Sequence, residues 1–337
     1  MHQRRRPLLA AVGLAAAPRW GRAQPAWPDR PVRFVIGGSA GGVSDILLRI
    51  LENRLRESLG QPIVLDPRAG AGGMVGAELV ARGPADGYNF YINHIASHGI
   101  GPTLYKRLSF DPLKDLPGVA RLAAMPNVLI VKGDSPHRSL GDLVAFIRAN
   151  PQKATFASAG TGTSSHLSGV LLGLRIGVET THVPYRGTAP SMAAVLNGEV
   201  LFNIDNAPAS RQQVLAGMVR ALAVSTAERA STMPELPTMQ EAGVADFDVA
   251  SWYGIAAPAA VPRPIIERLG QIFTTALREP ALAQRIRDFG AEPAPLGPAE
   301  YDAFMRQQVA IWAPVVPGGW SASTASAGVL ETQPPSQ

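Results

Sequence analysis

Cysteine is absent from this 337-residue chain, which excludes disulfide bonds, thiolate metal sites and cysteine nucleophiles. Long hydrophobic runs are also missing, because no stretch of 18 apolar residues occurs, so no transmembrane helix is expected. Five of the 31 basic residues lie in the first 23 positions, and the other 26 balance 26 acidic residues. Because no basic stripe remains, we do not expect nucleic acid as a partner.

The first 23 residues predict an export signal. Arg4, Arg5 and Arg6 form a charged region, and a short apolar run covers residues 8–17. Ten apolar residues are too few to span a bilayer. Residues 21–23 resemble a small-x-small cleavage site, so we expect cleavage near Ala23. The arginines leave both the general and the twin-arginine export routes open.

The strongest structural signal lies in residues 32–60. The β-branched run 32–36 predicts a buried strand, the small residues 37–42 predict a loop, and the apolar spacing that follows predicts a helix. Ser44 or Asp45 can cap this helix. A glycine loop before a helix leaves backbone N–H groups open, and the helix dipole favours negative charge there. This unit is therefore expected to hold an anion.

The same pattern returns about 120 residues later. Residues 154–157 predict a strand, 158–165 a loop of small hydrogen-bond donors, and 166–174 a helix. Strand and helix signals alternate along most of the chain, which predicts an α/β fold with mainly parallel sheets. The length favours two lobes. In such sheets, ligands bind outside the carboxyl ends of strands. Two facing loops would form a cleft that closes by hinge motion.

Three motifs have competing interpretations. Residues 37–41 match G-x-S-x-G, so a secreted serine hydrolase using Ser39 is the main alternative. However, the motif follows the first predicted strand, which leaves no room for the earlier strands of that fold, and the last histidine is His182. Residues 70–76 resemble a dinucleotide-binding turn, but the confirming acidic residue is missing, so a tight turn with close helix packing is favoured. His94 and His98 lack a third metal ligand, so one of them lining the cleft is the favoured interpretation.

Several polar and aromatic residues remain ambiguous. Asp45 can stabilise a helix dipole or present its carboxylate to a ligand. Asp205 and Asn206 follow a predicted strand, where they can cap a helix or line the cleft. Trp252 and Tyr253 are expected to pack in the core or between lobes. From residue 317 onward, the sequence has no helical or strand periodicity, so 317–337 are predicted to form a disordered tail.

An ordered set of short motifs resembles the Bug-type extracytoplasmic solute receptors, the binding components associated with tripartite tricarboxylate transporters. The resemblance covers about residues 27–316 and rests on the following motifs: WPDRPVR (27–33), GG (41–42) with Asp45, RAGAGG (68–73), DGY (86–88), PNVL (126–129), ASAGTGTSSHL (157–167), HVPYRG (182–187), RALAV (220–224), PT (237–238), EAG (241–243) and SWYG (251–254).

This resemblance implies a two-lobe type II periplasmic-binding-protein fold. Lobe 1 would comprise residues 27–125 plus 226–316, and lobe 2 residues 126–225. It implies no enzymatic activity, cofactor or metal. The protein would be a periplasmic monomer that binds a small carboxylate between its lobes and delivers it to membrane permease subunits. A ligand-binding partner of a membrane sensor remains an alternative.

The resemblance also implies the ligand-binding residues by position. Backbone N–H groups and waters would hold the carboxylate without an arginine clamp. The residues expected to bind the ligand are Ser39, Gly41, Gly42 and Asp45 from the first loop, Ser158, Ala159, Gly160, Thr163 and Ser164 from the second, and Asp205 and Asn206 on the opposite rim.

Overall fold

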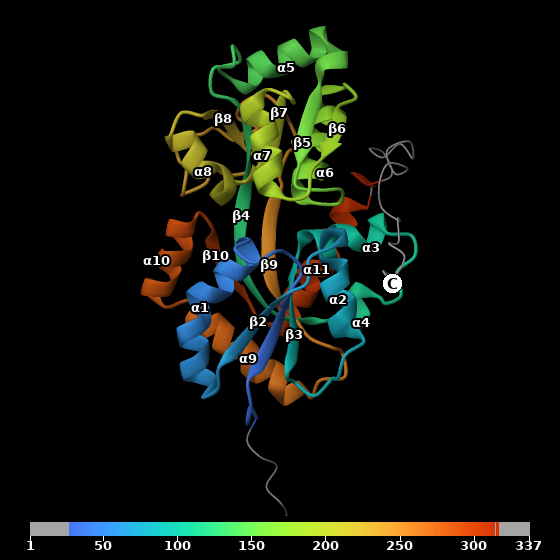
Figure 1. Ribbon diagram of the computed structural model, residues 1–337, viewed down its shortest axis with the longest axis vertical. Coiled ribbons are helices and arrows are strands. Elements are labelled where there is room, and N and C mark those ends of the chain that lie inside the picture. The colour runs from blue at the N-terminus through green and yellow to red at the C-terminus, as the bar shows by residue number, and fades with distance from the viewer. Residues whose placement is uncertain (1–26, 314, 317–337) are drawn as a thin grey trace, which may run out of the picture.

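The computed structural model describes residues 27–313, 315 and 316. The predicted signal peptide and the predicted C-terminal tail lie outside these residues. The described chain forms two lobes, one above the other (Figure 1). None of its helices combines the length and the apolar character needed to cross a membrane. The predicted two-lobe α/β fold is confirmed.

Lobe 1, the lower lobe in Figure 1, is built on strands in the order β2-β1-β3-β9-β4, with β10 also paired to β4. β1, β2 and β3 are parallel, whereas β9 is antiparallel to β3. Its elements are β1 (Val32–Ile36), α1 (Val43–Leu59), β2 (Ile63–Pro67), η1 (Ala71–Gly73), α2 (Met74–Ala81), β3 (Asn89–His94), η2 (Ile95–Ile100), α3 (Gly101–Leu104), α4 (Pro112–Asp115), β9 (Ala250–Ala256), α9 (Arg263–Ala276), α10 (Pro280–Phe289), β10 (Glu292–Leu296) and α11 (Pro298–Trp312).

Lobe 2 continues the sheet in the order β4-β7-β5-β6, with β8 also paired to β4. β5, β6 and β7 are parallel, and β4 is antiparallel to β7 and β8. Its elements are α5 (Leu140–Ala149), η3 (Pro151–Lys153), β5 (Thr155–Ser158), α6 (Ser164–Ile176), β6 (Thr181–Pro184), α7 (Thr188–Asn197), β7 (Phe202–Asn206), α8 (Ala207–Leu215) and β8 (Val219–Val224).

Strand β4 (Gly118–Lys132) belongs to both lobes. Residues 118–126 pair with β9, whereas residues 127–132 pair with β7 and β8. The chain therefore first crosses between the lobes inside one continuous strand. Residues 226–249, which we expected in lobe 1, pack on β8 instead: Met239 N–H donates to Val224 O at 2.9 Å, and Phe247 lies in a cluster with core residues of lobe 2.

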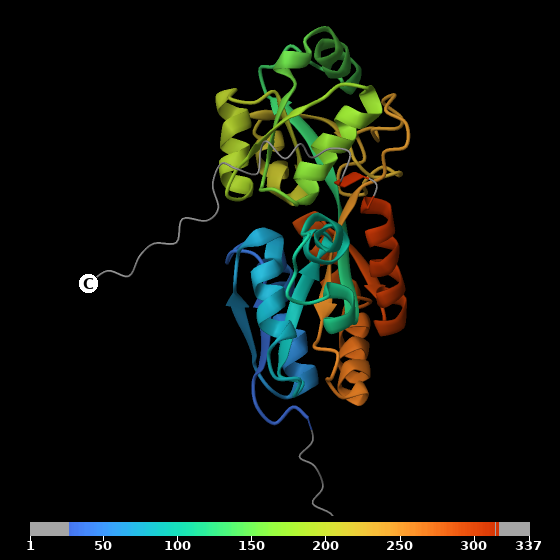
Figure 2. The same cartoon turned by 90° about the vertical axis from the view of Figure 1, so that its right-hand side faces the viewer.

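The two largest of four apolar clusters in the described residues stabilise the lobes and their junction. In lobe 1, Phe34 of β1 stacks on Phe90 of β3 with 5.6 Å between ring centroids, and Phe273 of α9 meets Phe34 edge-on. The other large cluster is not confined to lobe 2. Besides residues of α6, it contains Leu104 from α3 and Trp312 from α11, so burial of apolar surface also joins the lobes. Figure 2 shows α11 reaching the junction.

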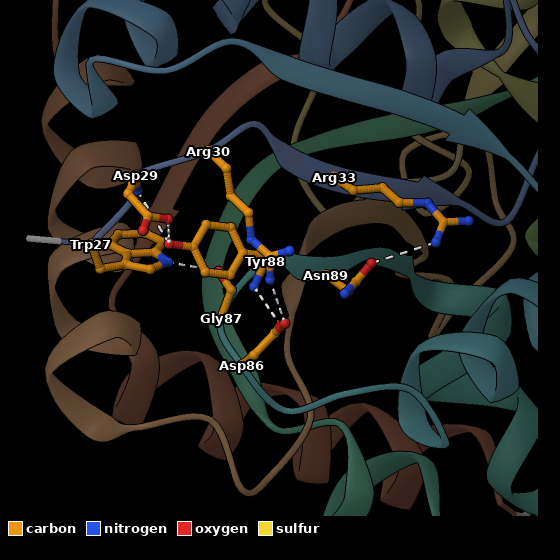
Figure 3. A network of polar contacts seen from close by, with 8 residues as sticks. All are labelled: Trp27, Asp29, Arg30, Arg33, Asp86, Gly87, Tyr88 and Asn89. Carbon is orange, nitrogen blue, oxygen red and sulfur yellow. Dashed lines mark hydrogen bonds and ion pairs between the residues drawn. The ribbon is translucent and has the colours of Figure 1, made fainter. Parts of the chain in front are cut away.

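The start of the described chain is anchored at the end of lobe 1 that lies away from lobe 2 (Figures 1 and 3). Tyr88 Oη donates to Asp29 Oδ1 at 2.6 Å. The Arg30 guanidinium lies over the Tyr88 ring, 4.1 Å from its centroid, and pairs with Asp86 at 2.8 Å. This network joins the residues before β1 to the turn before β3, so it fixes the first strand in the sheet.

Candidate functional site

The first predicted ligand loop joins β1 to α1. Helix α1 begins at Val43, its N-cap is Gly42, and no side chain caps it, so the predicted capping by Ser44 or Asp45 is wrong. The N–H groups of a first helical turn have no partner within the helix. Without a side-chain cap, they form the kind of site that favours an anion.

Asp45 connects this helix to the loop. Its Oδ2 accepts from Gly41 N–H at 2.9 Å and from Arg49 Nε at 3.0 Å. The Asp45 side chain is buried, and its Oδ1 has no partner among the described residues. Gly42 N–H donates to Ser39 O at 3.1 Å, while Ser39 itself is exposed. The four residues expected in this loop therefore lie together, and the Asp45 carboxylate holds the loop backbone.

A second loop of lobe 1, residues 70–73, lies directly against the first. A Cβ on Gly37 would come within 2.8 Å of Gly73 Cα. Tyr91 Oη donates to Gly73 O at 2.9 Å, and a Cβ on Gly73 would lie 2.8 Å from His94 Nε2. Only glycine leaves room for this approach at a φ of +90°. The tight turn was predicted, but its position beside the first loop was not.

The two histidines of the 94–98 segment have different environments. His94 ends β3, and its ring centroid lies 5.8 Å from that of Tyr253 on β9. Burial lowers the pKa of His94 to about 4, so its imidazole is neutral at neutral pH. His98 is fully buried, and its Nδ1 lies 3.0 Å from Ser97 Oγ. Residues 27–313, 315 and 316 contain no group of three side chains placed to hold a metal.

The loop of lobe 2 joins β5 to α6. Thr163 is the N-cap of α6: its Oγ1 accepts from His166 N–H at 3.3 Å and donates to Gly160 O at 2.6 Å. Ala159 N–H donates to Ser165 Oγ at 3.0 Å. Loop N–H groups that we expected to hold a ligand are therefore partly satisfied by neighbouring side chains. The N-terminal turn of α6 is the remaining anion-favouring feature.

Two stacked histidines, His166 and His182, form hydrogen bonds with residues of this loop. Ser158 Oγ lies 2.6 Å from His182 Nε2, and the rings of His182 and His166 are 3.9 Å apart at 25°. Gly162 N–H donates to His166 Nδ1 at 3.1 Å. Burial lowers the pKa of His166 to about 4 and, together with the His166 charge, that of His182 to about 3. Both imidazoles are neutral at neutral pH, as acceptance at His166 Nδ1 requires.

Asp205 and Asn206 end β7 and precede α8. Asp205 Oδ1 accepts from Asn206 N–H at 2.8 Å, whereas Asp205 Oδ2 has no partner among the described residues. Asp205 is 1 % exposed, and burial raises its pKa to about 6. Its negative charge in turn adds to the effect of burial in raising the pKa of Tyr253, a residue of the lobe 1 sheet.

A buried polar network connects the lobe 2 loop to the crossing strands. Ser251 Oγ of β9 lies 2.8 Å from Ser164 Oγ of α6 and 3.1 Å from Asn127 Oδ1 of β4. Asn127 Nδ2 donates to Ser168 Oγ at 3.1 Å. Ser164 was expected to bind ligand, but its hydroxyl belongs to this buried polar network. Helix α6 is therefore hydrogen-bonded to both strands at the crossing.

The loops of the two lobes meet through the segment that follows β3. A Cβ on Gly162 of lobe 2 would lie 2.5 Å from Leu104 Cδ2 of α3. Leu104 itself is buried in the cluster that joins the lobes. This segment contains η2, α3 and α4. In this stretch the sequence pointed to the cleft only through His94 and His98, one of which was expected to line it, and not through Leu104.

Ser39 lacks the partner that a serine nucleophile requires. In the described part of the chain, hydrogen bonds between serine and histidine side chains join Ser97 to His98 and Ser158 to His182, and none involves Ser39. Ser158 is fully buried, so a substrate cannot reach its hydroxyl. The geometry therefore does not support the hydrolase alternative.

An anion-favouring loop on each of two lobes, with strands crossing between the lobes, is the arrangement of a solute-binding receptor of the periplasmic-binding-protein type. Residues 47–318 match the model of the tripartite tricarboxylate transporter family receptors (TctC). The chain belongs to this family, as the resemblance to Bug-type receptors predicted.

Curated relatives match over most of their length. A UPF0065 protein from the tcbD–tcbE intergenic region of Pseudomonas sp. (strain P51) is 37 % identical, over 91 % of this chain and 92 % of the relative. Protein BugT of Bordetella pertussis is 32 % identical, over 92 % of this chain and 96 % of BugT.

Solved structures share the fold and include complexes with carboxylates. Rpa4515 of R. palustris with adipate has a TM-score of 0.82 and 35 % identity, covering 87 % of this chain and 98 % of that chain. The periplasmic binding protein BugD has a TM-score of 0.79 and 34 % identity over 87 % and 98 %. MatC of Rhodopseudomonas palustris with bound malate has a TM-score of 0.78 and 30 % identity over 86 % and 100 %.

Proposed function

We propose that this protein is a periplasmic receptor that binds a small organic carboxylate between its lobes and delivers it to the membrane subunits of a tripartite tricarboxylate transporter. It acts as a monomer, and no chemical step follows binding. The carboxylate interacts with the N-terminal turns of α1 and α6, and Asp205 and Asn206 lie on the opposite rim.

One observation carries this proposal. The loop after β5 in lobe 2 meets the segment after β3 in lobe 1 at the Leu104–Gly162 contact. In lobe 1, the loop after β1, the strand next to β3, leads into the uncapped helix α1. Backbone N–H groups and helix dipoles favour a carboxylate without a counter-charged side chain. The adipate and malate complexes of related receptors support the same ligand class.

Thermal unfolding tests the ligand class. The protein is purified from the periplasm, refolded to remove ligand, and melted with C4–C6 dicarboxylates, tricarboxylates, acidic amino acids, nicotinate and terephthalate. A ligand at 100 times its dissociation constant adds about 2.7 kcal/mol, which raises the melting temperature by several degrees. The diamide of each active acid is the matched control and should give no shift. Absence of a shift with every acid would contradict the proposal.

Uptake distinguishes transport from sensing. Deleting the gene should abolish accumulation of the radiolabelled acid that gives the thermal shift, and supplying the gene again should restore it. Normal uptake in the deletion strain, together with a lost transcriptional response to the acid, would favour the sensor alternative.

A further inference from the structure

Tyr105 lies at the junction of the loops and has no role in the site as described above. It is the C-cap residue of α3, where its N–H donates to Gly101 O at 3.0 Å. The preceding residue, Leu104, is buried in the cluster that joins the lobes. The Tyr105 side chain is partly buried against two apolar clusters, so it is held in place rather than free in solvent.

The phenol oxygen of Tyr105 lies close to glycine loops of opposite lobes. A Cβ on Gly72, in the second loop of lobe 1, would lie 3.3 Å from this oxygen. A Cβ on Gly162, in the loop of lobe 2, would lie 3.6 Å from it. Both glycines have a positive φ, +61° and +81° respectively. One hydroxyl therefore occupies the position where the two lobes approach each other.

This hydroxyl differs from most other tyrosine hydroxyls in the protein. Four of the six tyrosine hydroxyls donate to a protein acceptor: Tyr88 to Asp29, Tyr91 to Gly73 O, Tyr185 to Glu199 and Tyr301 to Asn93. No hydrogen bond within residues 27–313, 315 and 316 uses the Tyr105 hydroxyl. Burial raises the pKa of Tyr105, so the phenol keeps its proton at neutral pH and remains a donor.

We propose that Tyr105 is a ligand-recognition residue whose hydroxyl donates a hydrogen bond to a carboxylate oxygen of the acid held between the lobes. This inference rests on the proposed function and adds a side-chain donor to a site that the family resemblance assigned to backbone groups, waters and the Asp205–Asn206 rim. An uncharged donor suits this position. Its hydrogen bond is directional and so recognises a carboxylate oxygen, but it does not discriminate between acids of different net charge.

Glycine at both neighbouring positions meets the positive φ there and, at Gly162, the contact with Leu104, and it also leaves space around the hydroxyl. A side chain at Gly72 or Gly162 would occupy the space around the hydroxyl and block the approach of a ligand oxygen. The proposal also predicts that the ligand contacts lobe 1 through a residue after β3, in addition to the loop after β1. The ligand is then enclosed by three loops of lobe 1 and lobe 2 that the hinge brings together.

The test uses Tyr105→Phe, which keeps the ring and removes only the hydroxyl. Tyr88→Phe is the matched control, because its hydroxyl also donates a hydrogen bond, but to Asp29 in the network that anchors the residues before β1 (Figure 3). The full-length gene product is purified from the periplasm, and its dissociation constants for succinate, malate, glutarate and adipate are measured by calorimetry.

Loss of a hydrogen bond to a charged group should raise the dissociation constant of the acid that binds best by about tenfold to hundredfold in Tyr105→Phe, while Tyr88→Phe binds as wild type. The melting temperature of ligand-free Tyr105→Phe should match wild type.

Equal affinity of Tyr105→Phe and wild type would overturn the inference and leave the receptor function intact. If Tyr105→Phe loses both ligand binding and ligand-free thermal stability, the inference is also overturned, because the hydroxyl then has a packing role. Absence of binding by the wild-type protein to all four acids would contradict the receptor function for this ligand class, and the inference with it.

Discussion

His182 Nε2 lies 2.6 Å from Ser158 Oγ, so a half-buried imidazole holds the start of the lobe 2 ligand loop. The ring stacked on it, His166, holds the same loop near its end by accepting from Gly162 N–H. An imidazolium nitrogen cannot accept a hydrogen bond. The conformation of this loop therefore depends on His166 remaining neutral.

Acidification should destabilise the protein through this pair. Folding lowers the pKa of His166 to about 4 and that of His182 to about 3, whereas an unfolded histidine titrates near about 6.5. Because the pKa is lower in the folded state, the stabilising contribution is complete above about pH 6.5 and is lost as the pH falls toward about 4. The melting temperature should fall over this range, and less steeply in His182→Asn. Parallel slopes for variant and wild type would contradict this assignment.

Asp205 should have the opposite effect. Its pKa is raised to about 6 in the folded state, above about 3.9 for an unfolded aspartate, so its ionisation destabilises the fold as the pH rises through about 6. Asp205→Asn keeps an acceptor for Asn206 N–H and removes the charge. We expect it to stabilise the protein by about 2–3 kcal/mol at pH 8 and to have little effect at pH 4. Urea unfolding at both pH values measures this, and an equal effect at the two would contradict it.

Gly162→Ala should reduce both stability and ligand affinity. Gly177→Ala is the matched control, because Gly177 also has a positive φ, +71°, but nothing lies within 4 Å of its Cβ position. The control should lose about 1–2 kcal/mol from the left-handed backbone alone. Gly162→Ala should lose about 1–3 kcal/mol more, because its Cβ overlaps Leu104. Adding Leu104→Ala should restore part of that difference, and purely additive effects would show that the two residues are not coupled.

Asp45→Ala should weaken carboxylate binding, because Gly41 N–H then loses its acceptor and the exposed residues of the first loop lose a constraint. Asp45→Asn is the control, because it keeps an oxygen for Gly41 N–H and should bind closer to wild type. The dissociation constant of the acid identified by thermal unfolding measures the effect. Wild-type affinity in Asp45→Ala would show that this contact does not order the binding loop.

Local patterns were sufficient to predict the framework of the fold. The β-branched residues of β1 predicted its bounds, Val32–Ile36, because a buried strand needs a short apolar run. The two small-residue loops were predicted because glycine and serine mark the ends of such strands. The start of α1 was misplaced by about two residues, since Gly42 serves as an N-cap without a side-chain acceptor and leaves no polar signal.

The parts of the site that were missed depend on contacts between distant residues. The Ser158–His182 pair spans 24 positions and comes together only because β5 and β6 are adjacent strands. Tyr105 approaches Gly162 only after two lobes have formed. The segment containing Tyr105 lacks helical periodicity because it includes a six-residue π-helix, Ile95–Ile100, which places side chains off the 3.6-residue repeat. No local sequence pattern predicts such contacts between distant residues.

Strand β4 sets a limit on how separable the lobes are. Its first nine residues complete the sheet of lobe 1, and its last six complete that of lobe 2, without a linker between them. Excising either lobe would remove an interior strand from the other and expose both an unpaired edge and apolar surface. The protein should therefore melt as one cooperative unit. Its relatives are then expected to diversify by changing loops rather than by exchanging whole lobes as modules.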